Sequence, residues 1–267
     1  MEFRVRQTLC ALLCTSLLFI ANLAPAIAAE SIAYELISER THKPTLFTQG
    51  LLVDGDHFYE SSGLYNQSLL VSYPIAEPAS TWAKISAPFT KKQTIPGRYF
   101  AEGLALLGDK LYLLTWQEQT LLIYDKTTLN YEKSITYKGE GWGLTEDGKQ
   151  LIRSDGSDAL YFHSPDDFRI TKTLKVTDAG KPISQLNELE FAGGFIWANI
   201  WYQDRIIKID PVTGNVMGEM DLSGLKQTLQ LNNSEKVLNG IAWDEKQQAF
   251  WITGKLWPKM FLIRISQ

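Results

Sequence analysis

The chain has 267 residues, a formal net charge of −4 and a hydrophobic fraction of 45%. This length and composition allow the chain to bury a sizeable hydrophobic core. The small excess of acidic residues, with no basic stripe along the sequence, excludes a nucleic-acid-binding surface of the usual kind.

The N-terminus has the pattern of a secretory signal peptide. Two arginines precede an apolar run over residues 9–20, and residues 26–28 are the small Ala-Ile-Ala sequence that signal peptidases accept. The run is too short for a transmembrane helix, because about 20 apolar residues are needed and asparagine and proline soon follow. We therefore expect residues 1–28 to be removed, which leaves residues 29–267 as one periplasmic or secreted domain.

Both cysteines, Cys10 and Cys14, lie inside this predicted signal peptide. The mature chain would therefore have no disulfide, no thiol nucleophile and no cysteine metal site, which favours a bacterial periplasm. Cleavage also removes two arginines and one glutamate, so the net charge changes from −4 to −5. We expect the mature protein to be a monomer with no membrane or nucleic-acid partner.

After the signal peptide, short apolar runs alternate with Gly, Asp and Asn turns, a pattern typical of an all-β protein. Five segments share one order of features: a short motif, an apolar strand, a turn, a second strand and a third strand. In chain order the motifs are FTQGL (47–51), FAEGL (100–104), EGWGL (140–144), LNEL (186–189) and LNGI (238–241).

The repeat spacing identifies the architecture. Equivalent positions in the motifs are 53, 40, 45 and 52 residues apart, near the length of about 40–50 residues of a four-stranded blade. The sequence therefore predicts a five-bladed β-propeller, whose innermost strands line a central channel. Third strands are predicted at residues 68–73, 121–125, 160–163, 205–210 and 261–265. Because the last repeat ends at the C-terminus, we expect residues 31–39 to supply its outer strand and close the ring.

One position of the shared motif varies, which indicates function rather than fold. The five residues at this position are Gln49, Glu102, Trp142, Asn187 and Asn239. Thirteen residues after the aligned position, two repeats have Trp116 and Trp201, and Lys255 lies at the corresponding strand end of the last repeat. If these positions meet at one end of the channel, a carboxylate, amides, an ammonium group and indoles would form a pocket for a small polar substrate.

Glu102 is the strongest candidate for a chemical role. It lies between Ala101 and Gly103 at the start of an apolar strand, where a carboxylate needs a partner or a raised pKa. The alternative is a structural ion pair, for example with Lys255. Carboxylates that better fit turns or hydrogen bonds between blades are Glu60, Asp125, Asp155 and Glu190. Tryptophans that better fit the core are Trp197, Trp243 and Trp251.

These motifs resemble the plant-type and bacterial glutaminyl-peptide cyclotransferases, which are five-bladed propellers. The resemblance extends from about residue 47 to residue 265 and also includes YESSGLY (59–65), NELE (187–190), NIW (199–201) and GKLWPK (254–259). Members of this family convert the N-terminal glutamine of peptides or proteins to pyroglutamate and release ammonia. The resemblance therefore implies this activity and this class of substrate.

The resemblance also implies roles for individual residues. Glu102 would be the general acid and base, and Asn187 and Lys255 would orient the amide and stabilise its oxygen. The substrate-binding residues would be Phe47, Gln49, Trp116, Trp142 and Trp201. The chain departs from the family at Ala101 and Ala105, where glycine and threonine are more usual, which puts the substrate range in doubt more than the activity.

The resemblance implies that catalysis requires no cofactor. Members of the family can hold a structural calcium or zinc ion in the channel, but the sequence identifies no ligands for one. The residues 155–158, DGSD, offer calcium ligands but are more typical of a turn. Two other functions stay open: a noncatalytic exported propeller that binds peptides or sugars, and a calcium-dependent, lactonase-like hydrolase. The hydrolase would normally have six blades.

Overall fold

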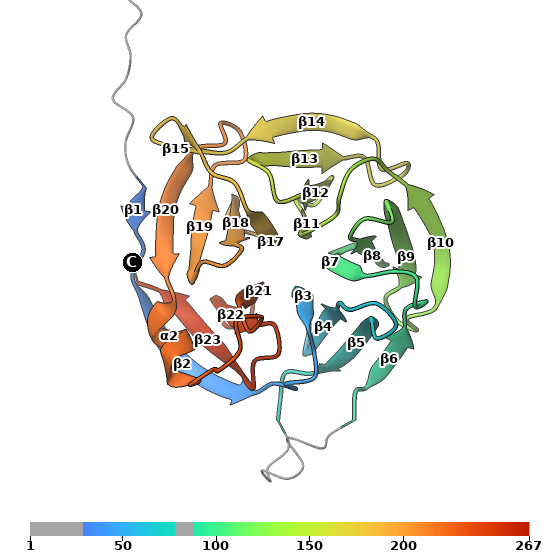
Figure 1. Cartoon of the computed structure of the whole chain (residues 1–267), viewed down its shortest axis with the longest axis horizontal. Helices are drawn as coiled ribbons and strands as arrows, with labels where there is room; N and C mark the ends of the chain where they lie inside the picture. Colours follow the sequence, from blue (N-terminus) through green and yellow to red (C-terminus); the bar gives the residue numbers. More distant parts are fainter. Residues whose placement is uncertain (1–28, 78–87, 267) are drawn as a thin grey trace, which may run out of the picture.

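The computed structural model describes residues 29–77 and 88–266, so the predicted signal peptide lies outside the described residues. Five sheets are arranged radially around a central channel, and their innermost strands are β3, β7, β11, β17 and β21 (Figure 1). The prediction of a five-bladed β-propeller is confirmed. In the described part of the chain, no helix is both long enough and apolar enough to cross a membrane.

Each of the first three blades is an antiparallel sheet of four consecutive strands. Blade 1 contains β3 (Thr48–Asp54), β4 (His57–Ser62), β5 (Leu69–Pro74) and β6 (Lys91–Thr94). Blade 2 contains β7 (Ala101–Leu107), β8 (Lys110–Thr115), β9 (Thr120–Asp125) and β10 (Tyr131–Thr136). Blade 3 contains β11 (Leu144–Glu146), β12 (Leu151–Ser154), β13 (Ala159–His163) and β14 (Ile170–Lys175).

The last two blades include strands from the beginning of the described chain. Blade 4 contains β17 (Leu186–Ala192), β18 (Phe195–Ile200), β19 (Arg205–Ile209), β20 (Val216–Asp221) and β1 (Glu30–Ser31). Blade 5 contains β21 (Leu238–Asp244), β22 (Ala249–Gly254), β23 (Lys259–Ile265) and β2 (Tyr34–Thr41). Outside the blades lie β15 (Thr177–Asp178), β16 (Lys181–Pro182) and α2 (Ser223–Thr228).

The ring closes as predicted, with one correction to the boundaries of the closing strand. β2 pairs antiparallel with β23, from Tyr34 opposite Ile265 to Thr41 opposite Lys259. The predicted strand at residues 31–39 therefore began and ended too early: β2 runs to Thr41, and before Tyr34 the pairing continues only as a hydrogen bond from the Ser266 N–H to the Ala33 carbonyl oxygen at 2.9 Å. Ser31 belongs instead to β1, which pairs in parallel with β20 of blade 4. The five predicted third strands are β5, β9, β13, β19 and β23, and their ends differ from the prediction by at most two residues.

The core consists of five apolar clusters, one between each pair of neighbouring blades. Side chains alternate between the two faces of a strand, so each blade contributes to two clusters. On β3, for example, Leu51 packs toward blade 5 and Leu52 packs toward blade 2. The innermost strands also contact one another around the channel, from β3 through β7, β11 and β17 to β21. This closed packing makes a rigid support for the channel ends.

Candidate active site

β-bulges interrupt strand pairing at the start of four innermost strands. In β7 the register with β8 shifts between Ala101 and Leu104, so that Glu102 falls within the irregular segment. The same shift occurs around Gln49 in β3, Asn187 in β17 and Asn239 in β21. A bulge re-aims a side chain that regular alternation would direct into a blade face. In these four repeats, the variable position is therefore the one that a bulge turns toward the end of the channel, whereas Trp142, the fifth residue of the set, lies before β11.

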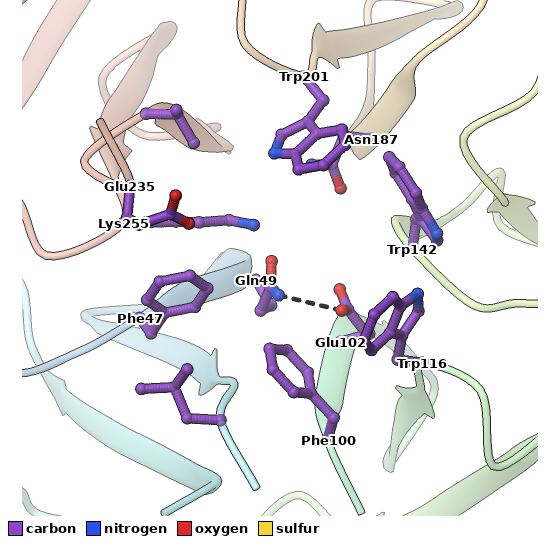
Figure 2. A pocket seen from close by; sticks show the side chains of 12 residues that line it. Phe47, Gln49, Phe100, Glu102, Trp116, Trp142, Asn187, Trp201, Glu235 and Lys255 are labelled. Carbon is purple, nitrogen blue, oxygen red and sulfur yellow. Dashed lines mark hydrogen bonds between the residues drawn. The ribbon is translucent and has the colours of Figure 1, made fainter. Parts of the chain in front are cut away.

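A pocket of about 270 Å³ lies at this end of the channel, and twelve residues line it (Figure 2). All eight predicted site residues are among them: Phe47, Gln49, Glu102, Trp116, Trp142, Asn187, Trp201 and Lys255. The four lining residues not predicted from the sequence are Leu64, Phe100, Glu235 and Val237. The structure thus brings every predicted site residue together, whereas the role of each residue stays a prediction.

Glu102 is only 6% exposed and lies deep in the pocket. Its Oε1 accepts a hydrogen bond of 3.0 Å from Gln49 Nε2, and Asn239 Nδ2 donates to Gln49 Oε1 at 3.3 Å. Burial raises the pKa of Glu102 well above its usual value; the charge of Lys255 opposes this shift. Glu102 is therefore a carboxylic acid that holds its proton to a higher pH than an exposed glutamate does.

Lys255 is the second buried titratable group of the pocket, with 7% of its surface exposed. Its Nζ lies 4.9 Å from the centroid of the Phe47 ring, and Figure 2 shows the amine directed into the pocket. Burial lowers the pKa of Lys255, and the carboxylates of Glu102 and Glu235 offset part of this effect. Among the described residues, no ion pair joins Lys255 to Glu102. The structural ion pair that the sequence left open for these two residues is therefore not formed.

Asn187 supplies a polar atom without a partner. The residue is 3% exposed, and within the described part of the chain its Oδ1 is buried and accepts no hydrogen bond. Figure 2 shows this oxygen directed into the pocket. An unsatisfied buried acceptor costs about 1–3 kcal/mol. A bound group with an N–H at this place would remove that cost.

The indole walls are held by Glu140, a residue that the sequence did not single out. Its Oε2 accepts hydrogen bonds from Trp116 Nε1 at 2.8 Å and from Trp142 Nε1 at 3.0 Å. Burial alone would raise the pKa of Glu140, but hydrogen bonds from Trp142, Trp116 and Gln117 outweigh it and the pKa is lowered. The Trp142 ring in turn meets Trp201 edge to face, with centroids 5.2 Å apart. Glu140 is thus a charged anchor for two walls of the pocket.

The described residues offer no side-chain cluster for the structural calcium or zinc ion that members of the family can hold. They contain no group of three His, Cys, Asp or Glu side chains arranged to hold a metal. Glu188 lies in the channel, but its two carboxylate oxygens accept hydrogen bonds from the backbone N–H groups of Leu51 at 3.2 Å and Ile241 at 2.8 Å. Asp155 Oδ1 likewise accepts from the backbone and hydroxyl of Ser157, as in a turn. These carboxylates join chain segments to one another.

Together, the fold and the pocket define a class of protein: a five-bladed propeller with an acid, an amine and an amide enclosed by aromatic walls at one end of its channel. The chain matches the glutamine cyclotransferase family model over residues 9–265, and it belongs to this family. The family indicated by the sequence motifs is therefore confirmed.

Two individual proteins support this assignment. The chain is 37% identical to the glutaminyl-peptide cyclotransferase of Arabidopsis thaliana over 237 residues, which cover 87% of this chain and 71% of that relative. The crystal structure of the glutaminyl cyclase of Myxococcus xanthus matches with a TM-score of 0.81 and 38% sequence identity. That match covers 89% of this chain and 98% of the other.

Proposed function

We propose that the protein is a glutaminyl-peptide cyclotransferase, which closes the N-terminal glutamine of a peptide into pyroglutamate with release of ammonia. The observation that carries the proposal is the buried acid Glu102 inside a pocket of about 270 Å³ that also contains Asn187 and Lys255. The size suits one amino-acid side chain rather than a long segment of peptide. Membership of the family and the names of the two relatives support the same reaction.

The reaction needs one proton donor and one proton acceptor in succession, and Glu102 can serve as both. The neutral α-amine attacks the carbon of the γ-carboxamide and forms a tetrahedral intermediate. Protonated Glu102 donates its proton to the amide nitrogen, the carbon–nitrogen bond breaks and ammonia leaves. The resulting carboxylate then accepts the proton from the former α-amine nitrogen. Acid–base catalysis by a positioned group typically contributes about 10²–10⁴-fold.

Asn187 and Lys255 would act on the groups that Glu102 does not reach. The unpartnered Oδ1 of Asn187 would accept an N–H of the substrate, and the Lys255 amine would donate to the oxygen that gains charge in the intermediate. Donors placed toward developing charge often make the largest contribution to catalysis. Gln49, which is held by Asn239, would keep the Glu102 carboxyl group in one orientation.

The aromatic walls would select the reactive conformation of the substrate. Cyclisation joins two groups of the same residue, so the rate depends on how often the side chain folds back toward the α-amine. Trp142 and Trp201 form two edges of the pocket at a fixed angle of 86°. A rigid, narrow pocket of this kind would favour the folded side chain over the extended one.

The test is the conversion of a Gln-initiated peptide, with ammonia release and pyroglutamate formation measured together. Wild-type protein should form both products in equal amounts, and Glu102→Gln should lower kcat by about 10²–10⁴-fold. The variant keeps a side-chain oxygen for the hydrogen bond from Gln49, so it should fold. Glu35→Gln changes an exposed residue of the outer strand β2 that does not line the pocket, so it is the matched control and should retain full activity. Peptide binding without any product would contradict the proposal.

Two further properties belong to the same proposal. The signal-peptide pattern of residues 1–28 supports a periplasmic or secreted location. The side chains of the pocket provide acid, base and hydrogen-bond donors themselves, which supports catalysis without a required metal. Activity should therefore persist after treatment with a chelator, whereas its loss would favour the metal-dependent hydrolase.

A further inference from the structure

Two exposed tyrosines flank the pocket, and each donates a hydrogen bond to a carboxylate. Tyr65 is 40% exposed and its hydroxyl donates to Glu118 Oε1 at 2.6 Å. Tyr202 is 54% exposed and its hydroxyl donates to Glu235 Oε1 at 3.2 Å. Large exposed aromatic side chains in such positions are typical of surfaces that bind a partner. These four residues are called the acidic rim below.

The acidic rim is continuous with the pocket. The Tyr65 ring packs edge to face on Phe100, at 5.4 Å between centroids, and the Tyr202 ring packs on Trp201 at 4.5 Å. Phe100, Trp201 and Glu235 all line the pocket. A chain that leaves the pocket therefore passes these tyrosines and their carboxylates.

The charge of the acidic rim is not neutralised by ion pairs. None of the ion pairs among the described residues includes Glu118 or Glu235. Lys255 alone is basic among the residues that line the pocket, and it is largely buried. The acidic rim therefore carries two carboxylates outside one buried cation, Lys255, on which the charge of Glu235 also acts.

The inner end of the pocket points to a ligand that brings a hydrogen-bond donor. Asn187 Oδ1 is buried without a partner and faces the pocket, so the bound group should carry an N–H. On the proposed function, this group belongs to the N-terminal glutamine, which fills the pocket. The next residue of the peptide then lies at the acidic rim.

We infer that the acidic rim makes the enzyme prefer peptides in which the residue after the N-terminal glutamine is lysine or arginine. This inference rests on the proposed function. A cation at that position would interact with both carboxylates and with the exposed faces of the tyrosine rings. An acidic residue there would be repelled. Peptides that share the N-terminal glutamine and its α-amine differ at the acidic rim only in the second residue.

The test uses three peptides that differ only at the second residue: Gln-Lys, Gln-Ala and Gln-Glu, each followed by the same neutral sequence. For wild-type enzyme at low salt, kcat/KM should fall in that order, by about two- to fivefold at each step, as expected for exposed charge pairs. The differences should shrink in about 1 M salt, where the Debye length is about 3 Å. Equal values for all three peptides at low salt would overturn the inference.

Variants assign the preference to these residues. Glu235→Gln and Glu118→Gln keep an oxygen that can accept the tyrosine hydrogen bond, and each should reduce the ratio of Gln-Lys to Gln-Glu by about two- to fivefold. Glu35→Gln changes an exposed carboxylate of the outer strand β2 and should leave the ratio as in wild type. An unchanged ratio in both rim variants would contradict the assignment.

Measurements of peptide binding without turnover test the charge preference separately from the proposed reaction. The dissociation constants of the same peptides for Glu102→Gln, measured by tryptophan fluorescence, should follow the same order without turnover. Ordered affinities with no product from wild type would refute the proposed reaction and support the charge preference. Product formation with equal rates and equal affinities would refute the charge preference alone.

Discussion

Glu140 offers a test of whether the pocket depends on fixed tryptophan walls. Glu140→Ala removes the oxygen that accepts hydrogen bonds from both Trp116 Nε1 and Trp142 Nε1. Glu140→Gln keeps an acceptor oxygen but removes its negative charge. The two variants therefore separate the loss of the anchor from the loss of the charge.

The expected effect follows from the strength of these bonds. A hydrogen bond to a charged group contributes about 1.5–3 kcal/mol, and partial exposure of Glu140 reduces what the pair can contribute. We expect a loss of about 2 kcal/mol of transition-state binding for Glu140→Ala, which is roughly a 30-fold lower kcat/KM. Glu140→Gln should lose roughly three- to tenfold, because charge-assisted bonds are about twice as strong as neutral ones.

Steady-state kinetics with a neutral Gln-initiated peptide give kcat and KM for each variant, and thermal unfolding checks that the fold is intact. Glu35→Ala, on the outer strand β2, is the matched control. If Glu140→Ala folds and keeps a kcat/KM within about twofold of wild type, the tryptophans do not need the carboxylate and the reasoning is wrong.

Three further predictions follow from single groups. The kcat/KM of wild type should be low at low pH, where the substrate α-amine, with a usual pKa of about 7.7–8.0, is protonated, and it should fall at high pH as Glu102, whose pKa is raised by burial, loses its proton. Glu102→Gln should lack the fall at high pH, and a fall of the same size in this variant would assign it to another group. Gly156→Ala should destabilise the protein by about 1 kcal/mol, because φ is +79° at this residue, and it should raise KM, because the new Cβ would lie 2.7 Å from the Trp142 ring. Gly148→Ala is the control for the backbone effect, because φ is +86° there and the new Cβ would meet no atom within 4 Å. Equal KM values for the two folded variants would contradict the packing argument. Burial raises the pKa of Glu190 to about 8, so between about pH 5 and about pH 8 the folded state keeps a proton that the unfolded state has lost. The free energy of unfolding should therefore fall as the pH rises through this range. Urea titrations should show a smaller fall for Glu190→Gln than for wild type, and an equal fall would show that other groups cause it.

The repeat made much of the fold predictable. A propeller blade buries its faces only against its neighbours, so every blade needs the same alternation of apolar residues and turns. That periodicity located all five third strands and the closure by the N-terminal segment. Short additions that follow no repeat were not predictable, such as β1 beside blade 4 and the β15–β16 hairpin. Their pairing depends on which sheet edge lies nearby in space.

The site was predictable only where its residues occupy equivalent positions in the repeat. Gln49, Glu102 and Asn187 share one motif position. Phe100 occupies the motif position of Phe47, so the repeat offered a signal for it, whereas Glu235 follows α2 in a loop outside the repeated motif. Glu140 lies inside a recognised motif, but its function depends on two indoles from different blades. No local pattern in the sequence encodes a hydrogen bond between blades.

The glycines of the shared motif explain why the neighbouring position was free to diverge. A Cβ on Gly50 would lie 2.4 Å from the backbone N of Leu104, and one on Gly143 would lie 1.9 Å from the carbonyl oxygen of Asn187. The innermost strands therefore approach too closely around the channel for any larger residue at these places. In the fourth repeat Glu188 takes this position, and its carboxylate accepts hydrogen bonds from the backbone of two other innermost strands, β3 and β21. Close packing of the strands restricts the aligned position, whereas the bulge turns the preceding side chain toward the end of the channel, where different residues fit.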